Sequence, residues 1–173
     1  MNDLNSKEVS DICVSCGMCC DGTMFRHGNI KTEEDLININ SKGIETIFER
    51  EKWVFKQPCK QFDGCCKIYG QERPQVCNNY FCEPLKKFEA NELSLGQAEN
   101  QIKTVLKLKR EMIDISNNFD IFNNLNWHQI LSKLDEIIIN QNPSELKFYG
   151  LMILKLSFFK NSKKKLYTSA KQV

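Results

Sequence analysis

Apolar residues recur at helical spacing through the second half of the chain, and this pattern predicts three helices there. The segments expected to be helical are residues 93–115, 126–140 and 143–160. In the first of them the apolar positions fall at helical intervals: Leu95, Ala98, Ile102, Val105, Leu106 and Met112. Residues at such intervals share one face of a helix. We therefore expect the three helices to pack on one another and to cover one side of the remaining chain.

Capping residues mark the starts of the last two predicted helices. Asn126 stands before the second, and its side-chain oxygen can accept a hydrogen bond from a free N–H of the first turn. Pro143 and Ser144 stand at the start of the third, where proline costs no hydrogen bond.

A further helix is expected in the first half of the chain. Thr32 can cap it, and Asp35 stands at the capping-box spacing three residues later. Ile44, Ile47 and Phe48 continue the helical spacing, so residues 43–51 are expected to be helical as well.

Two short segments, residues 52–59 and 62–69, carry strand and turn signals. KWVFKQPC, at 52–59, contains three successive residues that favour extended backbone. Asp63-Gly64 is a turn signal followed by a short β-prone run. A hairpin at this turn would bring Cys59 beside Cys66.

All nine cysteines lie in the first half of the chain: Cys13, Cys16, Cys19, Cys20, Cys59, Cys65, Cys66, Cys77 and Cys82. We expect Cys77 and Cys82 to lie on a helix entered at Pro74, or on its frayed end. This composition divides the chain into a cysteine-cluster domain, residues 1–90, and a helical extension with a basic tail, residues 91–173. The expected fold class is α+β and predominantly helical: a small, irregular, metal-bound N-terminal part with a short hairpin, packed against a helical C-terminal part.

The composition of the chain disfavours several classes of protein. A net charge of +2 over 173 residues does not favour a nucleic-acid binder. No stretch approaches the roughly 18 apolar residues that a membrane span needs, and the polar start of the chain does not resemble a signal peptide. We therefore expect a cytoplasmic protein, in which cysteines are more often metal ligands than disulfide partners.

The segment CVSCGMCC, at residues 13–20, has the spacing of a metal site. In Cys13-x2-Cys16-Gly17, two thiolates can grip one ion while the glycine turns the backbone through positive φ. Adding Cys19 gives the Cys-x2-Cys-x2-Cys run that opens many iron–sulfur sites. The run therefore fits either zinc or an iron–sulfur cluster. Alternatively, two of these cysteines could form a redox pair, but the strand–helix–strand pattern that accompanies such a motif is not visible here.

Cys19 and Cys20 are adjacent, so their side chains point in different directions whether the backbone is extended or helical. They are more naturally ligands of two metal centres, or bridging ligands of a cluster, than a chelating pair. With Cys59, Cys66, Cys77 and Cys82 the chain has eight thiols, enough for two four-coordinate sites. Cys65 is left over.

These residues resemble the YkgJ-type cysteine-cluster family, a zinc- or iron-chelating domain. The resemblance rests on CVSCGMCC, Pro58-Cys59 and CKIYGQERPQVCNNYFC, and it covers roughly residues 13–82. It implies one set of metal ligands: Cys13, Cys16, Cys19, Cys20, Cys59, Cys66, Cys77 and Cys82. The cysteine domain is also similar to part of the flagellin lysine N-methylases, which resemble iron–sulfur proteins acting on protein lysines.

Other candidate residues carry weaker signals. His27 could supply a nitrogen ligand, but eight thiols already suffice, so a surface or supporting role is favoured. His128 has no matching carboxylate or cysteine and is expected to be structural. Arg73 either forms a salt bridge or offsets thiolate charge, and Tyr69 either packs or supports the thiolates.

Three functions remain open from the sequence. One is an iron or iron–sulfur protein that supports protein modification or electron transfer. A second is a zinc-stabilised binding module without catalysis, with a protein partner on its helical extension. The third is metal storage or delivery. No carboxylate pair or P-loop indicates a particular enzyme.

Overall fold

The computed structural model describes residues 3–167, so the end of the basic tail lies outside the described residues. About 57% of the chain is helical, which confirms the predominantly helical α+β class. The helices are α1 (Asp3–Cys16), α2 (Glu33–Ser41), α3 (Gln75–Asn78), α4 (Glu83–Glu89), α5 (Leu95–Ser116), the 3₁₀ turn η1 (Asp120–Phe122), α6 (Trp127–Asn140), α7 (Pro143–Phe148) and α8 (Gly150–Leu166). The strands are β1 (His27–Ile30), β2 (Thr46–Glu49), β3 (Lys52–Lys56), β4 (Phe62–Asp63) and β5 (Cys65–Cys66).

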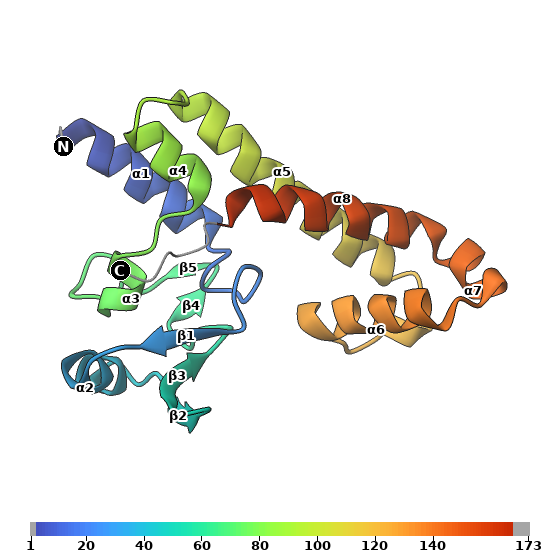
Figure 1. Cartoon of the computed structure of the whole chain (residues 1–173), viewed down its shortest axis with the longest axis horizontal. Coiled ribbons are helices and arrows are strands. Elements are labelled where there is room, and N and C mark those ends of the chain that lie inside the picture. The colour runs from blue at the N-terminus through green and yellow to red at the C-terminus, as the bar shows by residue number, and fades with distance from the viewer. Residues whose placement is uncertain (1–2, 168–173) are drawn as a thin grey trace.

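Three strands form an antiparallel sheet in the order β1-β3-β2, which lies below the long helices in Figure 1. The predicted strand at residues 52–59 is its central strand. The predicted helix over residues 43–51 is wrong, because this segment contains β2, in which Ile47 pairs with Val54. Arg50 and Glu51 turn the chain with φ of 50° and 64°, which closes a β2–β3 hairpin that helical spacing alone does not reveal.

The helix predicted from Thr32 is α2. The Asp35 N–H donates to Thr32 Oγ1 over 3.1 Å, as expected of the cap. The Asp35 carboxylate instead accepts a hydrogen bond of 2.7 Å from the backbone N–H of Gln75. The buried Asp35 side chain therefore connects α2 to α3, the short helix that carries Cys77.

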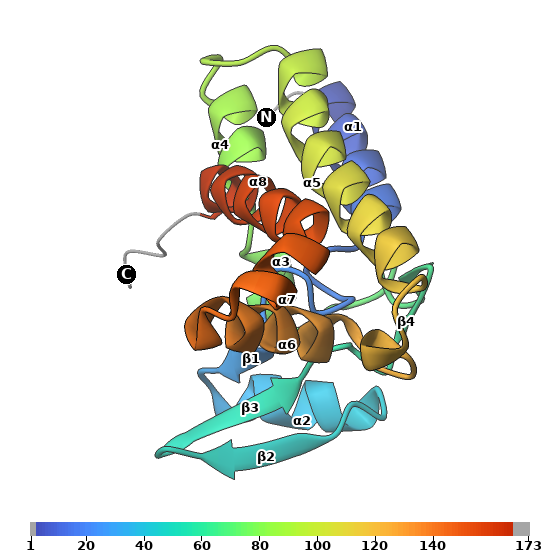
Figure 2. The ribbon, with the colours of Figure 1, turned by 90° about the vertical axis from the view of Figure 1, so that its right-hand side faces the viewer.

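The helical part contains α5, α6, α7 and α8, with α5 and α8 side by side in Figures 1 and 2. Asn126 caps α6 with a full capping box, as predicted. The single helix predicted over residues 143–160 is instead two helices, because the chain bends at Tyr149 (φ −95°, ψ 12°) between α7 and α8. The cap before Pro143 is Asn142.

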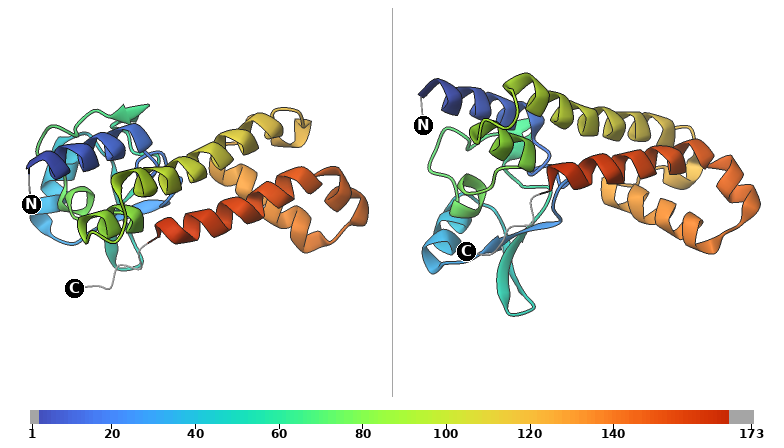
Figure 3. Two further views of the ribbon diagram at one scale, coloured as in Figure 1. Left: turned by 90° about the horizontal axis from the view of Figure 1, so that it is seen from above. Right: turned by 45° about the horizontal axis from the view of Figure 1, so that its top comes forward.

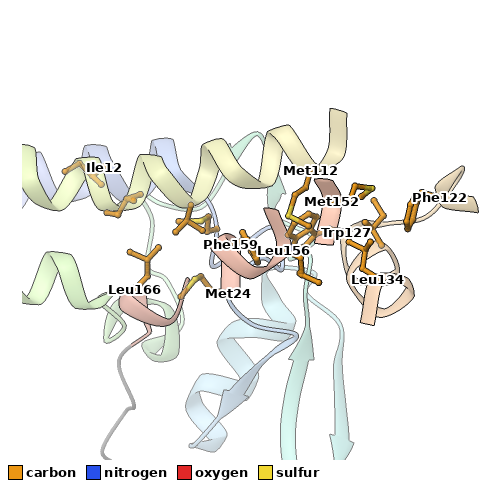
Figure 4. Packing of buried hydrophobic residues seen from close by; sticks show 14 of the residues in the cluster. Ile12, Met24, Met112, Phe122, Trp127, Leu134, Met152, Leu156, Phe159 and Leu166 are labelled. Atoms are coloured by element: carbon orange, nitrogen blue, oxygen red, sulfur yellow. The ribbon is translucent and has the colours of Figure 1, made fainter. Parts of the chain in front are cut away.

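The larger core lies between these helices and includes Met112, Trp127, Leu134, Met152 and Leu156, as Figure 4 shows. The sequence did not predict α1, because most of its residues are polar and only two of them belong to the core. Val9 and Ile12 from α1 pack into this core, and α1 lies along α5 (Figure 3). Within residues 3–167, no helix is both long enough and apolar enough to cross a membrane.

Candidate metal centre

The last turn of α1 carries the first two cysteines of the predicted motif. Cys13 and Cys16 are three residues apart on this helix, so they share a face rather than lying in an open knuckle. Gly17 follows with φ 62°, which confirms the predicted positive-φ glycine. A Cβ at Gly17 would lie 2.5 Å from the Phe62 ring, so the close approach of this ring also requires glycine.

The loop after Gly17 carries Cys19 and Cys20 and is held by an ion pair that the sequence did not reveal. Lys109 of α5 donates to Asp21 Oδ2 over 2.8 Å and to Thr23 Oγ1 over 2.6 Å. The Asp21 and Lys109 side chains are 20% and 14% exposed, so solvent screens this pair only in part. These partners lie 88 residues apart, and no local signal could have joined them.

The predicted hairpin is the pair β4–β5, in which Phe62 faces Cys66 and Gly64 turns with φ 69°. On β5 the exposed Cys65 and the half-buried Cys66 point to opposite faces. Cys59 lies just before the hairpin, and its N–H donates to the Cys20 carbonyl over 2.7 Å. The hairpin therefore brings Cys59 and Cys66 together, as predicted, and places them beside Cys20.

The helix predicted from Pro74 is broken. Pro74 is the N-cap of the short α3, which carries Cys77, whereas Cys82 is the N-cap of the separate helix α4. Pro84 belongs to the first turn of α4, where proline is tolerated, but it could not continue a helix from Pro74. The break lets Cys77 and Cys82 reach different neighbours.

One group of thiols gathers around the end of α1 and the start of α4. We call Cys13, Cys16, Cys19 and Cys82 the first cysteine set. The pKa of the Cys16 thiol is raised to about 12, mainly by burial, with smaller contributions from the neighbouring Cys82 and Cys13 thiols. Burial also raises the pKa of Cys19 well above its usual range, with added contributions from Cys16, Cys82 and Cys13.

The other group gathers around the β4–β5 hairpin. We call Cys20, Cys59, Cys66 and Cys77 the second cysteine set. A hydrogen bond between Cys20 and Cys66 raises the pKa of Cys20 and lowers that of Cys66 to about 6. Burial raises the pKa of Cys77 to about 12, and Cys59 and Cys66 contribute to the shift.

The two sets also pack against different hydrophobic cores. All four thiols of the first set contact the larger, helical core. Cys59, Cys66 and Cys77 of the second set contact a separate cluster of five buried residues: Ile30, Ile39, Ile44, Phe55 and Ile68. Cys19 therefore packs on the larger core, whereas the adjacent Cys20 joins the second set through its hydrogen bond with Cys66.

Each set has the chemistry of a thiolate metal site. Its thiols are close enough to disfavour one another's charge, and a bound cation would offset that repulsion. Among the described residues, no three side chains of cysteine, histidine, aspartate or glutamate stand close enough to form a finished site. The donor set therefore fits zinc or iron, with ligands that would draw together around the ion.

Arg73 is the cation that acts on both sets. Its charge lowers the pKa values of Cys13 in the first set and of Cys66 and Cys77 in the second. These effects are smaller than that of burial at Cys13 and Cys77, and smaller than that of the hydrogen bond at Cys66. Of the two interpretations of Arg73, the structure favours the one in which it offsets thiolate charge.

His27, the other candidate ligand from the sequence, lies at the start of β1 and its side chain is exposed.

A family model described as "CxxCxxCC: Putative zinc- or iron-chelating domain" matches residues 12–103, more than half of the chain. The chain belongs to the CxxCxxCC family. The match runs from the end of α1 into α5 and includes every cysteine of both sets. Searches of curated proteins and of solved structures found no match.

Proposed function

We propose that the protein holds two metal centres, one in each cysteine set. The observation that carries this proposal is the separation of Cys19 from Cys20: Cys19 packs on the larger core with the first set, whereas Cys20 hydrogen-bonds Cys66 of the second set. Each set then has four thiols. Four thiolates match the ligand count of a tetrahedral zinc site and of an iron–sulfur cluster. We also propose that the chain divides into a cysteine-cluster domain, residues 1–90, and a helical extension, residues 91–173.

The function that we propose is iron–sulfur chemistry, in support of electron transfer or modification of a protein partner. The two sets adjoin through the Cys19–Cys20 peptide bond, so their centres would be close neighbours. Arg73 would offset part of the negative charge that cysteine-bound clusters carry. A reducing cytoplasm would keep the thiols available as ligands.

The test is anaerobic purification followed by metal and sulfide analysis of the same sample. We expect a brown protein with iron and acid-labile sulfide in both sets. Cys16→Ser and Cys66→Ser should each lose one centre, and the double variant should lose both. If either single variant empties both sets, or neither loses metal, the assignment to two centres is wrong.

A zinc-stabilised module without catalysis is the second candidate. Four thiols per set would fill a tetrahedral zinc ion and leave no open position for a substrate, which favours a structural role. Colourless protein with two tightly held zinc ions and no sulfide would support this candidate and contradict the first. Loosely held metal that exchanges within minutes would instead indicate storage or delivery.

A further inference from the structure

A cleft of about 620 Å³ separates α6 from two loops that adjoin the second cysteine set. Its lining includes Asp21 and Arg26 from one loop, Gln57 from the other, and Trp127, His128 and Lys133 from α6. Asp21 directly follows Cys20, and the lining residue Pro58 directly precedes Cys59. Clefts of about 300–1,000 Å³ with a few convergent polar groups are typical of small-molecule sites.

Two buried polar atoms of the lining residues have no hydrogen-bond partner among the described residues: Gln57 Oε1 and Trp127 Nε1. The neighbouring His128 ring lies against the backbone of Gly22. The indole N–H of Trp127 can only donate, and this side chain is 8% exposed. Buried polar atoms without partners are uncommon and destabilise a fold. Two of them beside one cleft, from two separate segments, indicate a ligand that completes their hydrogen bonds.

The charges around His128 are positive. Burial lowers its pKa, and Arg26, Lys163 and Lys109 lower it further, each from a different segment. Lys109 is neutralised by Asp21. Among the charged lining residues, Asp21 is paired with Lys109 and Glu136 with Lys133, whereas Arg26 makes no ion pair within residues 3–167. Arg26 therefore leaves one unpaired positive charge at the cleft, and Lys163 lies near it.

These groups do not suit a metal ion. The Asp21 carboxylate is engaged by Lys109, and Glu136 is engaged by Lys133 over 3.1 Å. The unpaired Arg26 and the free indole N–H of Trp127 remain, and groups of this kind are those that proteins use to hold carboxylates and phosphates.

We propose that this cleft binds a small organic anion, whose carboxylate or phosphate group is held by Arg26, Trp127 Nε1–H and His128. Gln57 Oε1 accepts a hydrogen bond from a hydroxyl or amino group of the same ligand. The buried Gln57 and Trp127 atoms are covered by their neighbours, so side chains at the rim move apart as the anion enters. The proposal does not depend on which metal the cysteines hold.

Trp53 and Trp127 are the only tryptophans, and Trp53 lies on β3 with 41% of its surface exposed. A Trp53→Phe variant of the metal-loaded protein therefore makes Trp127 a single fluorescent reporter. It is titrated with inorganic phosphate and with citrate at constant ionic strength, with sodium chloride as the blank. We expect a saturable fluorescence change with at least one probe, and the same dissociation constant by calorimetry in the wild-type chain.

Arg26→Gln should weaken that binding about tenfold, the cost of one charge-assisted hydrogen bond. Arg110→Gln is the matched control, because Arg110 is exposed on α5 and does not line the cleft. Binding of phosphate alone would assign a phosphate ester, and binding of citrate alone a carboxylate. No saturable binding of either probe, or equal weakening by both arginine variants, would overturn the proposal. Unchanged metal content in Arg26→Gln separates this result from a failure of the metal centres.

Discussion

The guanidinium group of Arg73 stacks on the ring of Tyr69, with Cζ 3.9 Å from the ring centroid. The Tyr69 hydroxyl hydrogen-bonds the thiol of Cys13 in the first cysteine set. Arg73 itself acts on Cys66 and Cys77 of the second set. One stacked pair therefore connects the two sets, and Arg73 can lower the cost of thiolate charge in both.

Arg73→Leu should lower the affinity of both sets for metal by about tenfold, the usual effect of removing a group that supports metal ligands. Arg73→Lys should recover only part of the loss, because lysine keeps the charge but not the planar stacking group. Competition with a chromophoric chelator measures both affinities. Arg110→Leu is the control, and equal affinities for the Arg73 and Arg110 variants would show that the stacked pair has only a packing role.

The sequence predicted the fold best where a local pattern, such as an apolar helix face or a capping residue, fitted only one kind of element. Helix α5 has an uninterrupted apolar face, and Asn126 caps α6 as expected. Residues 43–51 misled because their apolar spacing fits both a helix and a short strand, and pairing with β3 decides between them. Helix α1 was missed because its stability comes from packing on α5 rather than from its own pattern.

The sequence supplies eight candidate ligands, which stay a prediction, but not their grouping in space. The adjacent Cys19 and Cys20 indicated two centres or a bridged cluster, because neighbouring side chains diverge. The sequence could not show that Cys82 joins Cys13 and Cys16 while Cys77 joins Cys59. That grouping depends on the break between α3 and α4 and on contacts between distant segments.

Cys65 should be the one thiol that reacts quickly in the metal-loaded protein. It is exposed, whereas Cys66 on the opposite face of β5 lies among the thiols of the second set. Brief treatment with iodoacetamide, read by mass spectrometry, should add one label at Cys65. Cys65→Ser should take up none and keep its full metal content. Loss of metal in Cys65→Ser, with retention in Cys66→Ser, would reverse the roles of the two residues.

Lys109→Met should destabilise the metal-loaded protein by about 2–3 kcal/mol, because it leaves the Asp21 carboxylate partly buried without its partner. Equilibrium unfolding in urea measures the change. Lys103→Met is the control, since Lys103 pairs with Glu99 at the exposed surface of the same helix and should cost less than about 1 kcal/mol. Similar losses in the two variants would mean that the Asp21 pair has no special role in holding the cysteine loop.

Leu134→Ala should cost about 3 kcal/mol, because this side chain is fully buried in the larger core and its removal leaves a cavity. Ile139→Ala, on the same helix but 74% exposed, should change stability by less than about 0.5 kcal/mol. Thermal unfolding of both variants provides the comparison. Equal stability of the two variants would contradict the packing of α6 on α8.

Metal removal should loosen the sheet before the long helices. The second cysteine set packs on a cluster of only five buried residues, so β1–β3 have little other support. The helices α5 and α8 share a much larger core, which does not depend on the thiols alone. Hydrogen exchange read by mass spectrometry, with and without chelator, should therefore show faster exchange in residues 46–56 and nearly unchanged exchange in residues 150–166. Equal acceleration in both segments would instead mean that the protein unfolds as one cooperative unit when the metal leaves.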